Sequence, residues 1–144
     1  MARPPRMPVW LPWEQAVIYF VTLCVENRQP VLANPESLAA LRTASTKLQH
    51  WKLLAAVLMP DHLHAIVTPS TDRAANLSNF SGALKRWIRQ QLNAQWEWQS
   101  GCFDRLLRSD ESVQNKWVYI RENPVRAGLV PKWEDWPYQI GFDN

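Results

Sequence analysis

Two histidines, His62 and His64, stand one residue apart in an apolar, β-branched segment. In a strand, alternate side chains project from one face, so both imidazoles would lie together, about 7 Å apart along the backbone. Two imidazoles at this spacing can converge on one metal ion. Because hydrogen-bonded structural histidines beside a turn fit the same pattern, this pair alone does not decide between the two interpretations.

A second candidate group consists of Tyr119 and Asn123, four residues apart in a segment of helical periodicity. Residues at this spacing are neighbours on one stripe of a helix. The sector of Val113, Trp117 and Ile120 predicts the core face, and Tyr119 lies about 120° from the centre of that sector. This position suits a phenol available for chemistry, although an ordinary half-exposed tyrosine satisfies it too.

Two imidazoles, an amide oxygen and a phenol together are suited to phosphoryl transfer. A divalent ion polarises a phosphodiester and offsets its developing charge, while a phenolate attacks phosphorus and forms a covalent phosphotyrosine. One phosphodiester replaces another, so a later attack by a 3′-hydroxyl can rejoin strands without ATP.

The hydrophobic pattern predicts the elements that must position these groups. The order β-α-β-β-α-β-α indicates an α+β fold of the ferredoxin-like kind, one antiparallel sheet with helices on one face. His50 is expected to end the first helix in a structural role. A length of 144 residues predicts one domain over 1–144, with an irregular arm at 1–13. The predicted strands are 16–25, 51–59, 62–68 and 102–107, and the predicted helices are 35–50, 76–96 and a third from 109 or 110 to 123.

The charge of +3 and the sequence pI of about 9.1 are compatible with a polyanionic partner without requiring one. The nine tryptophans offer aromatic faces on which unpaired bases stack, although packing in the core accounts for most of them. Two isolated cysteines and the absence of an export signal or an apolar run of membrane-spanning length predict a cytoplasmic protein. Five basic residues are candidate phosphate contacts, with solvated surface charge as the alternative: Lys85, Arg89, Arg105, Arg121 and Arg126.

Two segments resemble a known family. VLMPDHLHAIVTP (57–69) is similar to the HUH motif, histidine-hydrophobic-histidine, of single-tyrosine transposases. YIRENPVRAGLV (119–130) is similar to the signature that follows the nucleophile in REP-associated tyrosine transposases. YFVTLCVENRQPVL (19–32) and GCFDRLLRSDESV (101–113) resemble the same family in order and spacing, so the resemblance covers roughly residues 16–138.

The resemblance implies a protein that binds single-stranded DNA beside a hairpin and cleaves it, leaving a 5′-phosphotyrosine and a free 3′-hydroxyl, with Mg²⁺ or Mn²⁺ as cofactor. Tyr119 matches the nucleophile, His62 and His64 match the metal ligands, and Asn123 matches the polar residue that completes the metal site. Pro124 disfavours helical geometry at Asn123 and leaves the direction of its side chain open. The family also implies a monomer or a homodimer, in which the tyrosine serves its own or its partner's histidines.

Three functions remain open from the sequence. The first is an active endonuclease and strand transferase, indicated by the complete set of Tyr119, His62, His64 and Asn123. The alternative is a non-catalytic host factor that binds nucleic-acid hairpins, indicated by the mild basicity and the tryptophan content. The third is a metal-dependent hydrolase in which Tyr119 only orients the substrate.

Overall fold

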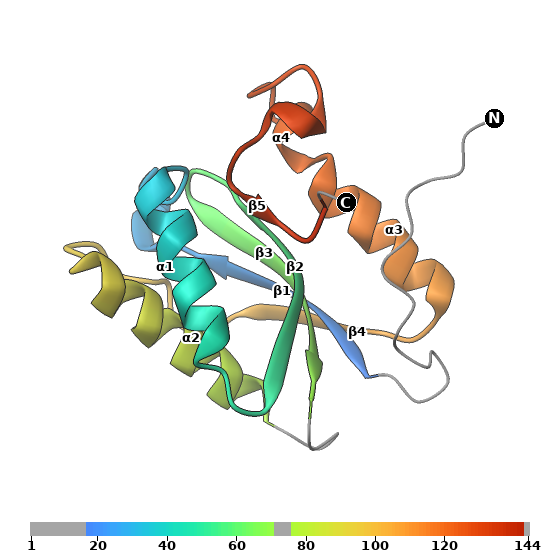
Figure 1. Ribbon diagram of the computed structural model, residues 1–144, viewed down its shortest axis with the longest axis horizontal. Coiled ribbons are helices and arrows are strands. Elements are labelled where there is room, and N and C mark those ends of the chain that lie inside the picture. The colour runs from blue at the N-terminus through green and yellow to red at the C-terminus, as the bar shows by residue number, and fades with distance from the viewer. Residues whose placement is uncertain (1–16, 71–75, 143–144) are drawn as a thin grey trace.

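The computed structural model of the chain describes residues 17–70 and 76–142, and the arm predicted at 1–13 lies outside these ranges. The described residues form a sheet in the order β4-β1-β3-β2-β5, in which all neighbouring strands are antiparallel (Figure 1). β3, which carries both histidines, is therefore a central strand between β1 and β2. The strands are β1 (Ile18–Cys24), β2 (Trp51–Leu58), β3 (His62–Pro69), β4 (Phe103–Leu107) and β5 (Gln139–Ile140).

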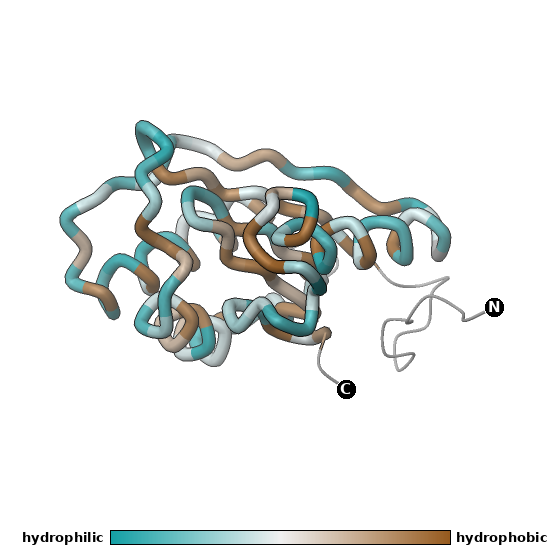
Figure 2. Tube along the Cα trace, turned by 90° about the horizontal axis from the view of Figure 1, so that it is seen from above, coloured by the Kyte–Doolittle hydropathy of each residue, from teal (hydrophilic) through white to brown (hydrophobic). Residues whose placement is uncertain are grey.

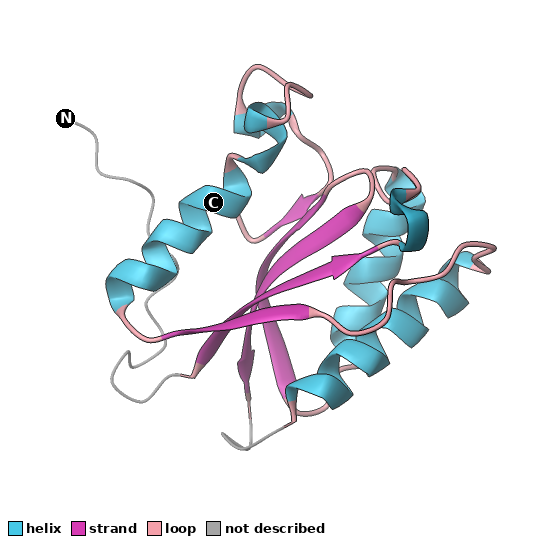
Figure 3. Cartoon of the chain, turned by 180° about the vertical axis from the view of Figure 1, so that it is seen from behind, coloured by secondary structure: helices cyan, strands magenta, loops and turns pink. Residues whose placement is uncertain are grey.

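The helices lie on both faces of this sheet. α1 (Pro35–Thr46) and α2 (Leu77–Leu92) cover one face, and α3 (Asp110–Arg121) covers the other, as the rear view also shows (Figure 3). The α+β class with an antiparallel sheet is confirmed. The expectation of helices on one face holds for α1 and α2, and is corrected for α3, because β3 is apolar on both sides and needs cover on both.

Local side-chain chemistry begins each long helix where the sequence predicts it. Asn34 accepts a hydrogen bond from the Ser37 backbone N–H at 2.8 Å, and the Asn76 and Ser109 side chains cap α2 and α3 in the same way. The first two helices end earlier in the chain than the sequence pattern predicts. α1 ends at Thr46, so His50 lies beyond the helix and does not end it as expected, because β2 already pairs with β3 from residue 51. α2 ends before Asn93, which adopts the left-handed conformation at φ 48°.

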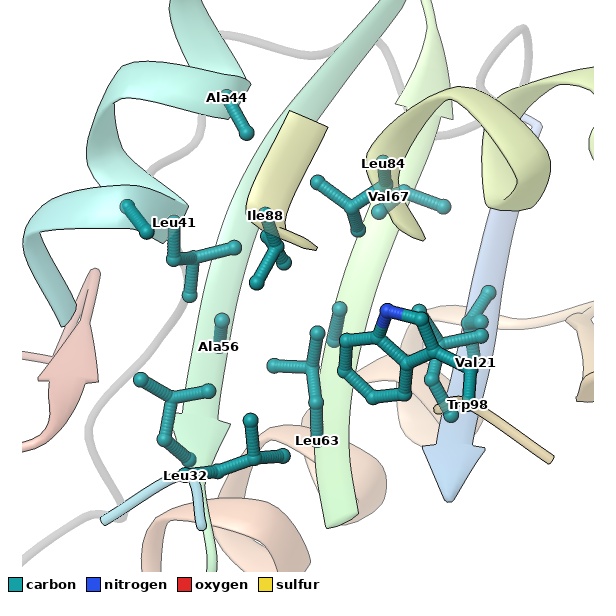
Figure 4. Packing of buried hydrophobic residues seen from close by; sticks show 14 of the residues in the cluster. Val21, Leu32, Leu41, Ala44, Ala56, Leu63, Val67, Leu84, Ile88 and Trp98 are labelled. Carbon is teal, nitrogen blue, oxygen red and sulfur yellow. The ribbon is translucent and has the colours of Figure 1, made fainter. Parts of the chain in front are cut away.

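Two buried clusters hold the layers together, and hydrophobic segments run through the interior while hydrophilic loops lie outside (Figure 2). The cluster under α1 and α2 includes Val21, Leu32, Leu41, Ala44, Ala56, Leu63, Val67, Leu84, Ile88 and Trp98 (Figure 4). The cluster under α3 includes Ile18, Ala55, Val57, Ile66, Leu107, Val113, Trp117, Ile120, Trp136 and Phe142.

The C-terminal segment completes the α3 side. Short helical turns, α4 (Asn123–Arg126) and a 3₁₀ turn at Trp133–Asp135, return the chain to β5, which pairs with β2. The indole N–H of Trp136 donates to the Leu58 carbonyl at 3.1 Å, and Gly141, at φ 93°, lies so close to β2 that a Cβ would be 2.4 Å from the Leu54 carbonyl oxygen. Within 17–70 and 76–142, no helix combines the length and apolar character needed to span a membrane.

Candidate active site

The two histidines lie at the start of β3, directly after the turn that follows β2. Their ring centroids are 4.6 Å apart and the rings are inclined by 76°. Strand alternation places them on the face that α3 covers, since Ile66, two residues further along, packs in the cluster beneath α3. The structure therefore brings together the pair that the sequence predicts.

A hydrogen bond orients each ring through Nδ1. His62 Nδ1 lies 2.7 Å from Asp61 Oδ1, and His64 Nδ1 lies 2.8 Å from the Thr22 hydroxyl. Asp61 also accepts from Arg28 Nε at 2.7 Å. No hydrogen bond to either Nε2 is made by the residues in the described ranges. A fixed Nδ1 with an unused Nε2 is the usual arrangement of a histidine that binds a metal ion.

The charge states of Asp61 and His64 suit this role. Burial raises the pKa of Asp61, but the hydrogen bonds from Arg28 and His62 outweigh it and lower the pKa overall, so the carboxylate is ionised at neutral pH. His64 is only 8% exposed, and burial, with the nearby charges of His62 and Arg126, lowers its pKa to about 3. His64 is therefore neutral at pH 7, the form that donates a lone pair to a metal.

Tyr119 projects from α3 beside these histidines. Its ring is 42% exposed, and the ring centroid lies 6.2 Å from that of His64. The Arg126 guanidinium lies 4.1 Å from the centroid of the Tyr119 ring and donates to the Tyr119 carbonyl oxygen. Lys116 Nζ lies 4.8 Å from the centroids of both the Tyr119 and Phe20 rings. Two cations thus restrain the ring through cation–π contacts and make its surroundings electropositive.

Asn123 is the first residue of α4, directly after the break between α3 and α4 at Glu122, so it is helical although Pro124 predicted otherwise. Its side-chain Oδ1 is buried and has no hydrogen-bond partner among the described residues. A buried amide oxygen without a partner is costly, unless a ligand or ion satisfies it. Asn123 therefore supplies an unused oxygen donor on the element that follows Tyr119.

These donors fit a divalent cation. His62 and His64 each offer Nε2, and Asn123 offers an amide oxygen, a mixed nitrogen and oxygen set that suits Mn²⁺ and is compatible with Mg²⁺. Groups of three or more His, Cys, Asp and Glu side chains able to hold a metal do not occur in the described part of the chain.

Two of the five predicted basic residues lie beside this site. Arg126 contacts Tyr119, as above. Arg105, on the exposed edge strand β4, pairs across the sheet with Phe20 and lines an open depression of about 520 Å³ together with Arg108 and Lys116. This depression lies between β4 and α3 and carries three positive charges.

The other three basic residues make contacts elsewhere in the fold. Lys85 donates to the carbonyl oxygens of Gln99 and Gly101, and Arg89 donates to the Trp96 carbonyl at 2.9 Å. Both project from α2, on the sheet face away from the histidines. Arg121 forms an ion pair with Glu122 at 2.9 Å, and its guanidinium lies 4.9 Å from the Trp133 ring centroid. The DNA contacts predicted for Lys85, Arg89 and Arg121 stay predictions.

Sequence reasoning missed four residues that contact the site: Asp61, Lys116, Thr22 and Phe20, whose ring stacks on that of His64. Asp61 directly precedes His62, so adjacency was an available signal for it. Lys116 is three residues before Tyr119 and therefore on the same side of α3. Thr22 had no such signal, because it reaches His64 only through the β1–β3 register, 42 residues away in sequence.

Sequence comparisons give named relatives over most of the chain. No family model matches the sequence. A protein of Haemophilus influenzae, provisionally named a REP-associated tyrosine transposase, is 28% identical over 84% of this chain and 77% of its own length. The REP-associated tyrosine transposase of Escherichia coli K12 is 27% identical over 83% of this chain and 73% of its own length.

Solved structures agree on the fold. A REP-associated tyrosine transposase bound to a REP hairpin superposes with a TM-score of 0.72 at 24% identity, over 85% of this chain and 75% of that one. A provisionally assigned transposase from Deinococcus radiodurans superposes with a TM-score of 0.55 at 17% identity, over 80% of this chain and 95% of that one. The resemblance read from the two motifs is confirmed: the sequence is similar to those of two proteins named REP-associated tyrosine transposases, and the fold is similar to that of a third.

Proposed function

We propose that this protein is a single-strand DNA endonuclease and strand transferase that acts on DNA flanked by a hairpin through a 5′-phosphotyrosine intermediate. The observation that carries the proposal is the position of Tyr119, whose ring lies 6.2 Å from that of His64, beside two imidazoles whose Nε2 atoms make no hydrogen bond to described residues. A structural tyrosine or a structural histidine pair gives no reason for these groups to meet at the start of a central strand.

The proposed reaction exchanges one phosphodiester for another. Tyr119 Oη attacks phosphorus and loses its proton, the bond from phosphorus to the 3′-oxygen breaks, and the 3′-oxygen takes up a proton to leave as a hydroxyl. The strand on the 3′ side of the break stays bound to Tyr119 through its 5′-phosphate. Attack by another 3′-hydroxyl reverses these steps, releases Tyr119 and joins two strands.

His62 and His64, through Nε2, and Asn123, through Oδ1, are the residues that would hold Mg²⁺ or Mn²⁺. Such an ion, when bound, polarises the phosphodiester and offsets the charge that develops on it. Asp61 and Thr22 fix the two imidazole rings from behind. A site held in this way needs little rearrangement when DNA arrives.

The electropositive residues around Tyr119 favour a polyanionic substrate. Lys116 and Arg126 flank the phenol ring, and we propose that Arg105 and Arg126 contact phosphates of the bound strand. The hairpin in the proposed substrate follows from the relative of known structure, which is bound to a REP hairpin. The similarity in sequence and fold to these relatives supports carrying this partner class to the present chain.

The test is formation of a covalent protein–DNA adduct. Purified protein is incubated with a labelled hairpin oligonucleotide that carries unpaired flanks, drawn from repeats near its own gene, with Mn²⁺ or Mg²⁺, and resolved on a denaturing gel. We expect a slower band that disappears in Tyr119→Phe and persists in Tyr138→Phe, which removes the hydroxyl of a partly buried packing residue in the C-terminal segment.

Other outcomes separate the competing functions. An adduct that persists in Tyr119→Phe contradicts the assignment of the nucleophile. Tight hairpin binding without cleavage under either metal would instead identify a non-catalytic hairpin-binding factor. A cleaved, water-derived product without any adduct would identify a hydrolase in which Tyr119 orients the substrate.

A further inference from the structure

An unassigned aromatic residue lies exposed on the edge strand beside the candidate site. Phe103, the first residue of β4, is 66% exposed, the largest exposed fraction among the large hydrophobic residues in the described ranges. All seven tryptophans in those ranges are buried or half-buried, so their faces are largely occupied by packing. The accessible aromatic surface that the sequence suggested for tryptophan is therefore offered by Phe103.

The strand register aligns Phe103 with the candidate site. Phe103 pairs with Thr22, and Thr22 pairs with His64 on the other side, so the three residues form one row across β4, β1 and β3. Residues directly opposite each other on antiparallel strands project from the same face. Leu107, four residues from Phe103 and hence on the same face of β4, is buried beneath α3 and identifies that face.

The separation suits a neighbouring nucleotide. Adjacent strands lie about 4.8 Å apart, so the Cα atoms of Phe103 and His64 are about 10 Å from each other across β1. A base attached to a phosphate at the candidate metal site can reach this far along an extended single strand. The Phe103 ring is not part of the proposed chemistry, but it borders the place where that chemistry occurs.

Positive charge continues from Phe103 along the same strand. Arg105 follows two residues later on the same face and lines a depression with Arg108 and Lys116, and Lys116 Nζ also lies 4.8 Å from the Tyr119 ring centroid. The acidic Asp104 alternates to the opposite face. A flat exposed ring followed by cations is the combination that holds single-stranded nucleic acid, with bases on the ring and phosphates on the cations.

We propose that Phe103 is a stacking platform for one unpaired base next to the scissile phosphate, and that it positions the strand for attack by Tyr119. The inference rests on the proposed function for the identity of the strand. It assigns the occupant of this exposed sheet edge to single-stranded DNA rather than to a second copy of the chain.

The test is a double-mutant cycle between protein and DNA, measured as equilibrium binding in the Tyr119→Phe background, so that cleavage does not interfere. A series of hairpin oligonucleotides carries a single abasic site at successive unpaired positions. At one position, loss of the base should weaken binding about 5- to 150-fold. Phe103→Ala should weaken binding of the intact DNA by a similar factor and should no longer respond to the abasic site at that position.

Two further variants control for shape and folding. Phe103→Trp keeps a flat ring and should retain the response to the abasic site. Leu129→Ala removes another exposed apolar side chain, 43% exposed and outside the site, and should behave as the parent protein does. Circular dichroism of each variant establishes that it is folded before binding is compared.

The outcomes distinguish a failure of the stacking platform from a failure of the proposed endonuclease activity. Additive effects of Phe103→Ala and abasic sites at every position would overturn the platform. A dimer that Phe103→Ala dissociates, with no coupling to any base, would assign the edge to a second copy. If the platform fails while the wild-type adduct still forms, the proposed function stands; if no adduct forms but the coupling is present, Phe103 stacks a base in a binding protein that does not cleave.

Discussion

The two faces of the sheet use the same strands for different purposes. Toward α1 and α2, the central strands present Val21, Leu63 and Val67, each at most 1% exposed. Toward α3, the alternate positions of the same strands present Thr22, His62 and His64. Because neighbouring residues of a strand point to opposite faces, one strand contributes to a closed core and to an open site at once.

The two faces of the sheet differ in how completely helices cover them. Two capped helices seal one face, whereas α3 and the C-terminal segment cover the other only as far as the histidines. The two imidazoles are tolerated at this boundary because the Nδ1 atom of each has a hydrogen-bond partner. A rigid closed face thus supports a site whose groups are held before any ligand arrives.

The largest effect on stability should come from the closed face. Phe80, 1% exposed, packs between α2 and the sheet, with its ring centroid 5.1 Å from that of Trp51. Phe80→Ala should lower the free energy of unfolding by about 3–5 kcal/mol, since it leaves a cavity where the surroundings relax only in part. Urea denaturation followed by tryptophan fluorescence measures this change, and Mn²⁺ affinity of the remaining folded protein should be unaltered.

The matched variant on the open face is Phe20→Ala. Phe20 stacks on His64 at 5.3 Å between ring centroids and lies under Lys116, but it is only half-buried. Its loss should cost less stability than Phe80→Ala and yet reduce adduct formation, because His64 and Tyr119 lose a common neighbour. The reverse result, with the larger stability loss at Phe20 or a weaker metal site in Phe80→Ala, would contradict the division between the faces.

Mild acid should lower the free energy of unfolding through His64, which lies on the open face. The pKa of His64 is lowered to about 3 in the folded chain, against an ordinary value of 6.5, so between these values the unfolded chain binds more protons. The free energy of unfolding should therefore fall as pH drops through this window, by about 2 kcal/mol between pH 7 and pH 5. Asp61 adds nothing at pH 5, because its lowered pKa stabilises the fold above about 3.8 and that contribution is lost only below it.

His64→Gln provides the comparison for the acid effect. Glutamine cannot be protonated, so urea denaturation in EDTA at pH 7 and pH 5 should show a smaller difference for the variant than for the parent chain. An identical loss in both proteins would place the acid-sensitive group outside the histidine pair and remove this distinction between the faces.

Local chemistry made much of the fold predictable. The apolar run of β3 and the helix caps at Asn34 and Ser109 depend only on residues close together in sequence. The proximity of His62 and His64 follows from the two-residue period of a strand. Local patterns do not predict on which face of the sheet α3 packs, because the apolar stripe of a helix can pack on either side of a sheet that is apolar on both faces.

Long-range register and loop conformation explain the other differences. Thr22 meets His64 only because β1 pairs with β3 in one register. The carbonyl groups that Lys85 and Arg89 bind belong to the segment after α2, whose path follows from the left-handed turn at Asn93. A pattern of basic residues reports where charge occurs, but the fold decides which of those charges already have partners.

The smallest expected effect tests whether the open face is organised around His64. Thr22→Val preserves the shape of the side chain but removes the hydroxyl that holds Nδ1, so Mn²⁺ affinity should fall about tenfold. Titration of the protein into Mn²⁺, followed by electron paramagnetic resonance, measures this. Thr68→Val is the control: it lies on the same face of β3 and loses a 2.7 Å bond to the Val17 carbonyl, far from the site. Equally weakened Mn²⁺ binding in both variants would mean that the loss of any hydrogen bond on this face disturbs the site. Weaker binding in Thr22→Val alone would show that the contact between Thr22 and His64 on neighbouring strands orients the metal ligand.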